Sequence, residues 1–417
     1  MVTPLVPSPA GLSAGAIVMH GQLSSLARRH RVTLAAVGWP DPSNNADVER
    51  LRETGCEVCC VWRPRRTAAV RWRLRLARTV EWLGTDRPMR AIALYEPELQ
   101  RSIDRLTRER KYDVVQVEDI AAAGYRYPRT APIVLTDHDV RPRADAVRRG
   151  APGPGAFLAR DRNRWRRYQA RCWRRFDAIQ VFTARDAAEA RTIEPEIAGR
   201  TFVNPFGVDL PAAADTAREE PATVVFVGGF LHPPNVDAAL WLVRDILPEI
   251  RRRRPDVRLV LAGADPPRPI RALARDGVEV TGRVPAVEPV LERAAVVVAP
   301  LRTGGGMRLK VLQAMGMGKA VVATSLAAEG VTRHDGDDAM LVADDARAFA
   351  ACVAELLGAP DSRRSLGRRA REAVRLHHGW AGYGERLEAL YAAVRDDRRR
   401  TSVSARTGET LRRSVAG

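Results

Sequence analysis

The sequence predicts an α/β protein made of two Rossmann-like domains, each built on a parallel sheet. Short β-branched apolar runs alternate with longer helix-like stretches along nearly the whole chain. The runs contain few polar residues, which is typical of strands whose two faces are both covered by helices. The alternation breaks once, in a Pro-, Ala- and acid-rich stretch at 209–222, which we interpret as a linker between the domains.

Twelve apolar runs are candidate strands, and they divide equally between the two halves of the chain. In the first half they lie at 32–38, 56–62, 112–118, 132–139, 176–183 and 201–207. In the second half they lie at 223–229, 257–263, 278–282, 294–300 and 319–325, with a weaker run at 338–343. Alternating strands and helices imply right-handed crossover connections. Parallel sheets bind ligands beyond the carboxyl ends of their strands, so two such edges facing each other would form a cleft.

These runs suggest where the domains begin and end. We expect an N-terminal domain at 1–208, the linker at 209–222, a C-terminal domain at 223–378 and a closing helix at 379–394. The last segment, 395–417, is polar with few large apolar residues, and we expect it to be disordered.

One further segment, 62–82, alternates Trp and Leu with Arg, which is neither a regular helix pattern nor a regular strand pattern. It could form a basic helix resting on anionic lipid, but we favour a solvated helix that covers the acceptor side of the first domain.

The chain is strongly basic, with a formal net charge of +18 over 417 residues. This charge suits anionic partners such as nucleotide phosphates or an anionic membrane surface. It also fits a general preference for Arg, because the arginines are spread over most of the chain. No recognised nucleic-acid-binding module is present, so we expect no nucleic-acid partner.

Cysteine usage and apolar run lengths point to the cytoplasm. The C-x-x-C-C group at 56–60 lies in an apolar run without a nearby His or second Cys pair, so we interpret it as buried strand residues rather than a metal site. We find no stretch of about 20 apolar residues that could span a membrane, and no basic start followed by an apolar stretch that would mark a secretory signal.

The segment 296–324 carries the strongest binding signal. An apolar strand is followed by a loop with Gly304, Gly305 and Gly306, and a helical pattern begins near Met307. Glycines let the backbone approach a ligand closely. The free N–H groups of a first helical turn, together with the helix dipole, favour an anion.

Two cations strengthen this prediction. Arg308 and Lys310 fall in the first turn of the expected helix. There the Arg308 guanidinium can bond a phosphate through two N–H groups, and the Lys310 ammonium can act as a point charge. Gln313 shares a helix face with Lys310 and lies one turn beyond it, where a ribose hydroxyl would bind.

In the first half, three polar residues end an apolar run. Asp137, His138 and Asp139 lie at the carboxyl end of the expected strand 132–139, where active-site groups belong in this architecture. Polar residues at a strand end can also be turn formers, so both interpretations stay open.

Taken together, the motifs resemble those of glycosyltransferase family 4, the retaining GT-B glycosyltransferases. QAMGMGKAVV after the glycine loop is similar to the family's E-A-M-A core before G-K-P-V-V. The other matching segments occur in the same order as in the family: FVGGF with HPPNVDAALWL, then LAGA, TGRVP and the closing GWAGYGERLEALY. The resemblance covers nearly the whole chain. It implies a GT-B fold, with an acceptor-binding N-terminal domain and a nucleotide-sugar-binding C-terminal domain facing a central cleft.

The resemblance also implies roles for individual residues on the donor side. Arg308 and Lys310 would hold the donor diphosphate, and Gln313 stands where the family has a glutamate that bonds the ribose. The full set assigned to the donor is Gly15, Gly228, Gly229, Arg283, Val284, Gly305, Gly306, Met307, Arg308, Lys310 and Gln313. Within this set, Arg283 and Val284 would lie against the base, whereas Gly228 and Gly229 would leave room for the phosphates.

On the acceptor side, the resemblance assigns His138 to the donor sugar, and Asp137 or Asp139 to orienting the imidazole or binding the acceptor. The helix that follows usually carries a glutamate where this chain has Gln169. Met1 would fall within the family's first strand.

The implied reaction is sugar transfer with retention of configuration. The donor would be a UDP- or GDP-linked sugar acting as co-substrate, and the acceptor a glycan, a lipid-linked molecule or a small molecule. His138, Arg308 and Lys310 would supply the catalytic groups. We identify no Asp-x-Asp pair that would suggest a metal clamp, so we expect no metal and no further cofactor. Contact with the inner face of an anionic membrane would fit a lipid-linked acceptor. Two alternatives remain open, a nucleotide-sugar epimerase of the same fold and a non-catalytic homologue that binds nucleotide sugars.

Overall fold

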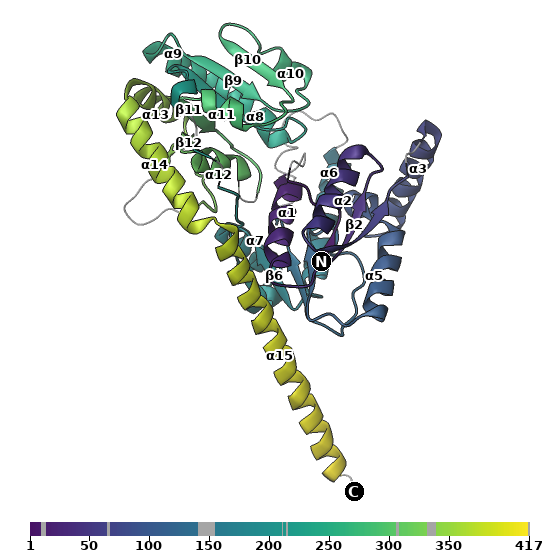
Figure 1. Cartoon of the computed structure of the whole chain (residues 1–417). Helices are drawn as coiled ribbons and strands as arrows, with labels where there is room; N and C mark the ends of the chain where they lie inside the picture. Colours follow the sequence, from purple (N-terminus) through teal and green to yellow (C-terminus); the bar gives the residue numbers. More distant parts are fainter. Residues whose placement is uncertain are drawn as a thin grey trace. The chain divides into compact units, whose positions relative to one another are not determined.

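The computed structural model describes residues 1–9, 14–64, 67–140, 155–210, 212–213, 216–305, 308–331 and 339–415 (Figure 1). The chain divides into two compact units. The first contains Met1–Pro142, Gly153–Asn204 and Tyr383–Gly417, and the second is built mainly from Pro205–Gly382. The chain thus leaves the first unit after Asn204 and returns to it at Tyr383.

The first unit is built on a seven-stranded parallel sheet in the order β3-β2-β1-β4-β5-β6-β7. Its strands are β1 (Val2–Thr3), β2 (Thr33–Gly38), β3 (Glu57–Trp62), β4 (Val115–Glu118), β5 (Ile133–Thr136), β6 (Ala178–Val181) and β7 (Thr201–Val203). The strand order reverses between β1 and β4, which makes the carboxyl ends of these two strands the topological switch point of the sheet.

Helices connect the strands of the first unit. They are α1 (Ala14–Ala27), α2 (Pro42–Glu53), α3 (Ala68–Gly84), α4 (Met89–Leu94), α5 (Pro97–Glu109), α6 (Gly155–Trp173), α7 (Ala184–Ile193) and the long C-terminal α15 (Trp380–Val415), with a 3₁₀ turn at Pro195–Arg200. Side-chain caps define several helix starts; for example, Asp41 accepts the backbone N–H of Asn44 at the start of α2.

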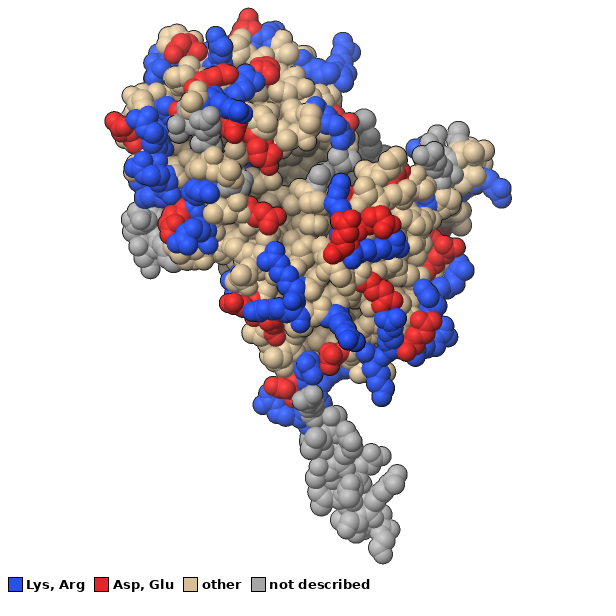
Figure 2. Space-filling view, in the orientation of Figure 1, with Lys and Arg blue, Asp and Glu red and all other residues tan. Residues whose placement is uncertain are grey.

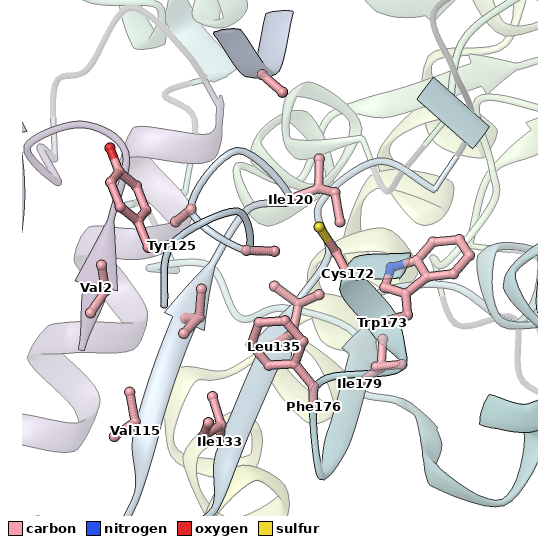
Figure 3. Packing of buried hydrophobic residues seen from close by; sticks show 14 of the residues in the cluster. Val2, Val115, Ile120, Tyr125, Ile133, Leu135, Cys172, Trp173, Phe176 and Ile179 are labelled. Atoms are coloured by element: carbon pink, nitrogen blue, oxygen red, sulfur yellow. The ribbon is translucent and has the colours of Figure 1, made fainter. Parts of the chain in front are cut away.

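Both faces of this sheet are covered by apolar packing. Along β2, Leu34 and Ala36 join one buried cluster while Ala35 and Val37 join another, because successive side chains point to opposite faces. The larger cluster includes Trp173 and Phe176, and Figure 3 shows part of it. This packing explains why the strands read as unbroken apolar runs.

The second unit is built on a six-stranded parallel sheet in the order β10-β9-β8-β11-β12-β13. Its strands are β8 (Thr223–Val227), β9 (Arg258–Ala262), β10 (Val278–Gly282), β11 (Val296–Ala299), β12 (Ala320–Ala323) and β13 (Leu341–Val342). Here the strand order reverses between β8 and β11, so the loops after these two strands flank the switch point.

The helices of the second unit complete its layers. They are α8 (Pro233–Trp241), α9 (Leu247–Arg253), α10 (Arg268–Arg271), α11 (Glu288–Arg293), α12 (Leu309–Gly316), α13 (Ala346–Gly358) and α14 (Pro360–His377), with a π turn at Leu242–Ile246 between α8 and α9. A 3₁₀ turn at Thr216–Arg218 lies in the expected linker, just before β8.

The twelve strands expected from the sequence are confirmed, each within its expected range. The Arg- and Trp-rich segment forms the helix α3, as both interpretations of it expected. One segment differs from expectation, because residues 395–415 continue helix α15 instead of forming a disordered tail. Arg, Ala and Glu in that tail are strong helix formers, which the apolar composition alone did not reveal.

Surface charge is mixed, and no part of the described chain forms a helix long and apolar enough to cross a bilayer. Figure 2 shows Lys and Arg side chains intermingled with Asp and Glu over the visible face. On this face the basic character is distributed over both units, as the even spread of Arg along the sequence suggested.

Candidate functional site

The switch point of the second sheet brings together the predicted phosphate-binding residues. The loop after β8 contains Gly228 and Gly229, and the loop after β11 contains Gly304 and Gly305 and leads to Arg308. Because both loops leave neighbouring strands at the same carboxyl edge, they flank the position where ligands bind in this fold.

Glycine is required at Gly228 by close packing. A Cβ there would lie 2.7 Å from Cγ of Asn235, and the carbonyl oxygen of Gly228 lies 2.1 Å from the position of a Cβ at Gly263. Gly229 differs, because a Cβ there would meet nothing within 4 Å. The side-chain amide of Asn235 donates to the carbonyl oxygen of Gly229 at 2.8 Å, so Asn235 ties the start of α8 to this loop.

Lys310 is held at the same place. Its Nζ donates to Oδ1 of Asn235 at 2.6 Å and lies 4.6 Å from the ring centroid of Phe226. Burial, and secondly the positive charge of Arg308, lower the pKa of Lys310 to about 7. The site therefore disfavours positive charge when no anion is present.

Arg308 is the N-cap residue of α12 and is only 8% exposed. Its Nη1 donates to the carbonyl oxygen of Gly305, and Gly304 adopts a φ of +106° in the same loop. Arg308 and Lys310 thus lie in one turn with their charges close enough to interact. The predicted Gly306 and Met307 lie outside the described residues, and α12 begins at Leu309, slightly later than expected.

Three further predicted donor residues, Gln313, Arg283 and Val284, lie in the same unit. Gln313 is partly buried on α12, one turn beyond Lys310. Arg283 and Val284 follow β10, where Arg283 is exposed and its Nη2 lies 3.6 Å from a carboxylate oxygen of Asp265. Arg283 and Val284 therefore lie at the same carboxyl edge of the second sheet as the glycine loops. They follow its outermost strand, β10, which β9 separates from β8.

In the first unit, His138 follows β5 and pairs with Glu118 at the end of β4. His138 Nε2 lies 2.7 Å from Oε2 of Glu118, whose side chain is fully buried. The ring also lies edge-on to Phe182, with centroids 5.0 Å apart. Burial opposes the charged imidazole, but the hydrogen bond and negative charge of Glu118 outweigh it and raise the pKa of His138.

The two aspartates that flank His138 do not bond its ring. Asp137 is 1% exposed and accepts hydrogen bonds from Trp173 Nε1 at 2.9 Å and Gln169 Nε2 at 3.5 Å. Burial, and secondly the charge of Asp119, raise the pKa of Asp137 to about 7. Asp139 donates its backbone N–H to Asp137 at 3.3 Å. The group that orients the imidazole is therefore Glu118, which the sequence analysis did not single out.

Gly15 is the second residue of α1 and is partly buried. α1 follows the loop after β1, so Gly15 lies beside the switch point of the first sheet, near the start of a helix. This placement agrees with the predicted loop-to-helix turn, although residues 10–13 lie outside the described part of the chain.

A buried set of hydrogen-bonded side chains, which we call the polar layer, supports the His138–Glu118 pair. Gln22 Nε2 and Gln116 Nε2 donate to Oε1 of Glu118 at 2.6 and 2.7 Å. Tyr383 of α15 donates to Gln22 Oε1 at 2.9 Å. The members are Gln22, Gln116, Glu118, Thr136, Gln180, Asn204, Tyr383 and Tyr391. The signal that could have revealed it is the pair of polar residues inside the apolar run that forms β4.

Metal ligands do not gather within the described residues, where no group of three or more His, Cys, Asp or Glu side chains could hold an ion. Asp137 and Asp139 have the one-residue spacing of an Asp-x-Asp pair, but the Asp137 carboxylate is used by Trp173. Cys56 is buried and Cys59 and Cys60 are partly buried in β3, as expected for strand residues, and none forms a disulfide.

Comparisons with known sequences identify related proteins. The family profile described as Glycosyl transferases group 1 matches residues 221–359. A phosphatidyl-myo-inositol mannosyltransferase of Mycolicibacterium smegmatis is 30% identical over 218 residues, which are 49% of this chain and 55% of that protein. An uncharacterized 44.6 kDa protein in the cps region of Klebsiella pneumoniae is 26% identical over 136 residues, 30% of this chain and 35% of that protein. The matches thus span about half, or less, of the length of these relatives.

Solved structures resemble the chain over almost its full length. Sucrose-phosphate synthase from Thermosynechococcus elongatus has a TM-score of 0.67 at 17% identity, covering 94% of this chain and 98% of that one. Anabaena HepE in complex with UDP has a TM-score of 0.63 at 12% identity, with the same coverage. At such identities the likeness concerns the fold. The chain therefore has the GT-B fold of glycosyltransferases, and its C-terminal domain carries a Glycosyl transferases group 1 match at residues 221–359.

Proposed function

We propose that this protein is a retaining glycosyltransferase that moves a sugar from a nucleotide-diphosphate-sugar donor to an acceptor. The observation that carries the proposal is the pair of cations at the start of α12, Arg308 as its N-cap and Lys310 in its first turn, at the switch point of the second sheet. Arg308 is buried, and Lys310 is partly buried with its Nζ bonded to Asn235, which supports a binding site rather than two solvated charges.

A diphosphate is the ligand that suits this pair. The first-turn N–H groups and the dipole of α12 favour an anion, Arg308 can bond two phosphate oxygens, and Lys310 supplies a compact charge. Because burial and Arg308 lower the pKa of Lys310 to about 7, an arriving anion would restore its full charge. The site is thus prepared to bind negative charge more strongly than an exposed pair of cations would.

The nucleotide would extend from the diphosphate along the carboxyl edge of the sheet. Gln313 would bond the ribose, Arg283 and Val284 would contact the base, and Gly229 has open space that a phosphate could use. HepE, whose fold this chain shares, has been solved with UDP and with UDP-glucose. This supports a uridine donor, with GDP as the alternative to test.

Catalysis would depend on stabilising the departing diphosphate. As the bond from the sugar to the diphosphate breaks, Arg308 and Lys310 would neutralise the charge that develops on the leaving oxygen. That oxygen would accept the acceptor's proton on the same face of the sugar, which gives retention. His138, oriented by Glu118, would contact the donor sugar, and Gly15 would let the loop before α1 approach it. With two cations in this role, we propose a reaction that needs no metal.

We propose an acceptor that is a glycan, a lipid-linked molecule or a small molecule. The name of the mannosyltransferase relative, which refers to a phosphatidyl-myo-inositol, supports the lipid-linked class. The five free cysteines suit a reducing compartment, and we propose a cytoplasmic protein that works at the inner face of the membrane.

Product analysis tests the proposal. The protein is incubated with UDP- and GDP-sugars labelled in the sugar, with and without glycan and lipid acceptors, and the products are separated and examined by NMR. We expect slow donor hydrolysis without acceptor, and a new glycosidic bond with the donor's anomeric configuration when acceptor is added. A changed sugar without transfer would identify an epimerase instead. Nucleotide binding with neither hydrolysis nor transfer would identify a non-catalytic homologue.

A further inference from the structure

Helix α3 packs against its own unit through one face only. Trp82 is 4% exposed, and its Nε1 donates to Oδ1 of Asp161 at 2.7 Å. The guanidinium of Arg164 lies 4.2 Å from the centroid of the Trp82 ring, and Arg78 Nη2 donates to the carbonyl oxygen of Ala93 at 3.1 Å. These contacts fix the orientation of α3 on the outside of the unit (Figure 1).

The opposite face of α3 exposes large apolar side chains. Trp72 is 65% exposed, Leu76 52%, Val80 60% and Leu83 60%. Their spacings of four, four and three residues place them in one line along the helix, which we call the α3 stripe. At a rise of about 1.5 Å per residue the stripe is about 16 Å long. Single exposed apolar residues are ordinary, but four in a line mark a contact surface.

Positive charge borders the stripe on both sides. Arg73 and Arg75 are exposed and, by helix geometry, lie on opposite edges of the stripe. The acidic residue of α3, Glu81, lies on the packed side and forms an ion pair with Arg87 at 2.6 Å. Among the described residues no carboxylate forms an ion pair with Arg73 or Arg75, so this surface combines apolar side chains with positive charge.

We propose that the α3 stripe rests on the surface of an anionic phospholipid bilayer. Trp72 and its apolar neighbours would enter the boundary between headgroups and acyl chains, while Arg73 and Arg75 would bind lipid phosphates. A second copy of the chain is a poorer occupant, since two α3 stripes packed together would bring four arginines into one interface. The proposal is independent of the transfer reaction, because lipid binding needs neither donor nor acceptor.

Vesicle flotation with the full chain tests the surface. The vesicles are phosphatidylcholine alone, or phosphatidylcholine with about 30 mol% phosphatidylglycerol. We expect binding to the anionic vesicles only, with a loss when NaCl is raised from about 0.05 M to about 0.5 M. Trp72→Ser with Leu76→Ser should weaken binding about tenfold or more. Arg73→Gln with Arg75→Gln should also weaken vesicle binding. In a separate fluorescence measurement, vesicles should shift the tryptophan emission of the parent to the blue, and Trp72→Phe should remove part of this shift.

Matched controls separate the surface from general effects. Leu376→Ser changes a side chain that is 56% exposed in the second unit, and Arg101→Gln with Arg126→Gln removes the same charge from another surface of the first unit. Both controls should bind vesicles as the unchanged protein does. Because the stripe is exposed, its variants should keep the thermal stability of the parent. Equal vesicle binding by stripe and control variants would overturn the proposal. The proposal would also be overturned if light scattering showed that the parent and the control variants are dimers while the stripe variants are monomers.

Discussion

The imidazole of His138 lies 2.7 Å from the carboxylate of Glu118, a residue 20 positions earlier that is fully buried. Glu118 ends β4 and His138 follows the end of β5, and the parallel register, in which Glu118 lies opposite Thr136, brings the two side chains together. The bond occupies Nε2 of the ring and fixes the direction in which Nδ1 points. Two amides of the polar layer complete the environment of the carboxylate.

Glu118→Gln should remove a pH-dependent part of the stability. The pKa of His138 is raised in the folded protein, so its contribution is complete below about pH 6.5 and is lost as the pH rises through the folded-state value. An amide cannot attract the imidazolium in this way. In urea unfolding, the parent should lose stability between about pH 5.5 and about pH 8.5, and the variant should lose less over the same range. An identical pH dependence would mean that the pair is not charged.

Asp137→Asn should stabilise the protein at high pH. Burial raises the pKa of the Asp137 carboxyl from its ordinary value of 3.8 to about 7 in the folded protein. Its favourable contribution is therefore present below about pH 4 and is lost as the pH rises through 7. An asparagine can still accept the Trp173 hydrogen bond without a buried charge. At about 1.4 kcal/mol per pKa unit, a gain of about 1–4 kcal/mol is expected at pH 8, with little change near pH 4.

Unfolding at these two pH values measures this difference directly. A variant that is less stable than the parent at pH 8 would show that the ionised carboxylate has a favourable role, such as binding the acceptor. That result would return Asp137 to the substrate site suggested by its place at the end of a strand.

Tyr383→Phe should destabilise the protein more than Tyr391→Phe. The Tyr383 hydroxyl donates to Gln22 and accepts from Gln180, whereas Tyr391 donates to Gln116 alone. Each buried group left without its partner costs about 1–3 kcal/mol, so the loss of two partners should cost more than the loss of one. Denaturant unfolding of both variants gives the comparison. An equal or reversed order would mean that the polar layer accommodates the missing hydroxyl, for instance with water.

Gly228→Ala and Gly229→Ala form a matched pair for the donor site. The new Cβ at Gly228 would lie 2.7 Å from Asn235, which must move and release Lys310, so we expect a cost of about 1–3 kcal/mol and weaker nucleotide binding. A Cβ at Gly229 meets nothing within 4 Å, so its stability should change by less than about 0.5 kcal/mol. Nucleotide binding by Gly229→Ala should nevertheless weaken, because the methyl group occupies the open space. Unchanged affinity would remove Gly229 from the donor site.

The strands were predictable from the sequence because helices cover both faces of each sheet. That burial requires unbroken apolar runs, and runs such as the one at 294–300 are visible without any structure. The end of α15 was harder, because its helical form follows from propensity, which an apolar pattern does not record. For α3 a helix was expected, but its anchoring by distant residues such as Asp161 could not be inferred from the pattern.

The candidate site was predictable only where its residues are neighbours in sequence. Arg308 and Lys310 follow a glycine loop, so the motif can be read directly. Asn235 contacts Lys310 across 75 positions, and Gln22 contacts Glu118 across 96. Such partners are brought together by the sheet order, and no spacing along the chain indicates them.

Nucleotide-induced thermal stabilisation tests most directly whether Arg308 and Lys310 hold a diphosphate. UDP and GDP are titrated into the parent, into Arg308→Ala with Lys310→Ala, and into the exposed control pair Arg252→Ala with Arg253→Ala. Lys310→Met is added in case the double variant folds poorly. At about 100 times Kd, ligand binding stabilises a protein by about 2.7 kcal/mol. We predict that at least one nucleotide clearly raises the melting temperature of the parent and of the control pair. The melting temperature of the two site variants should not change. Equal shifts in the parent and the site variants would contradict the assignment.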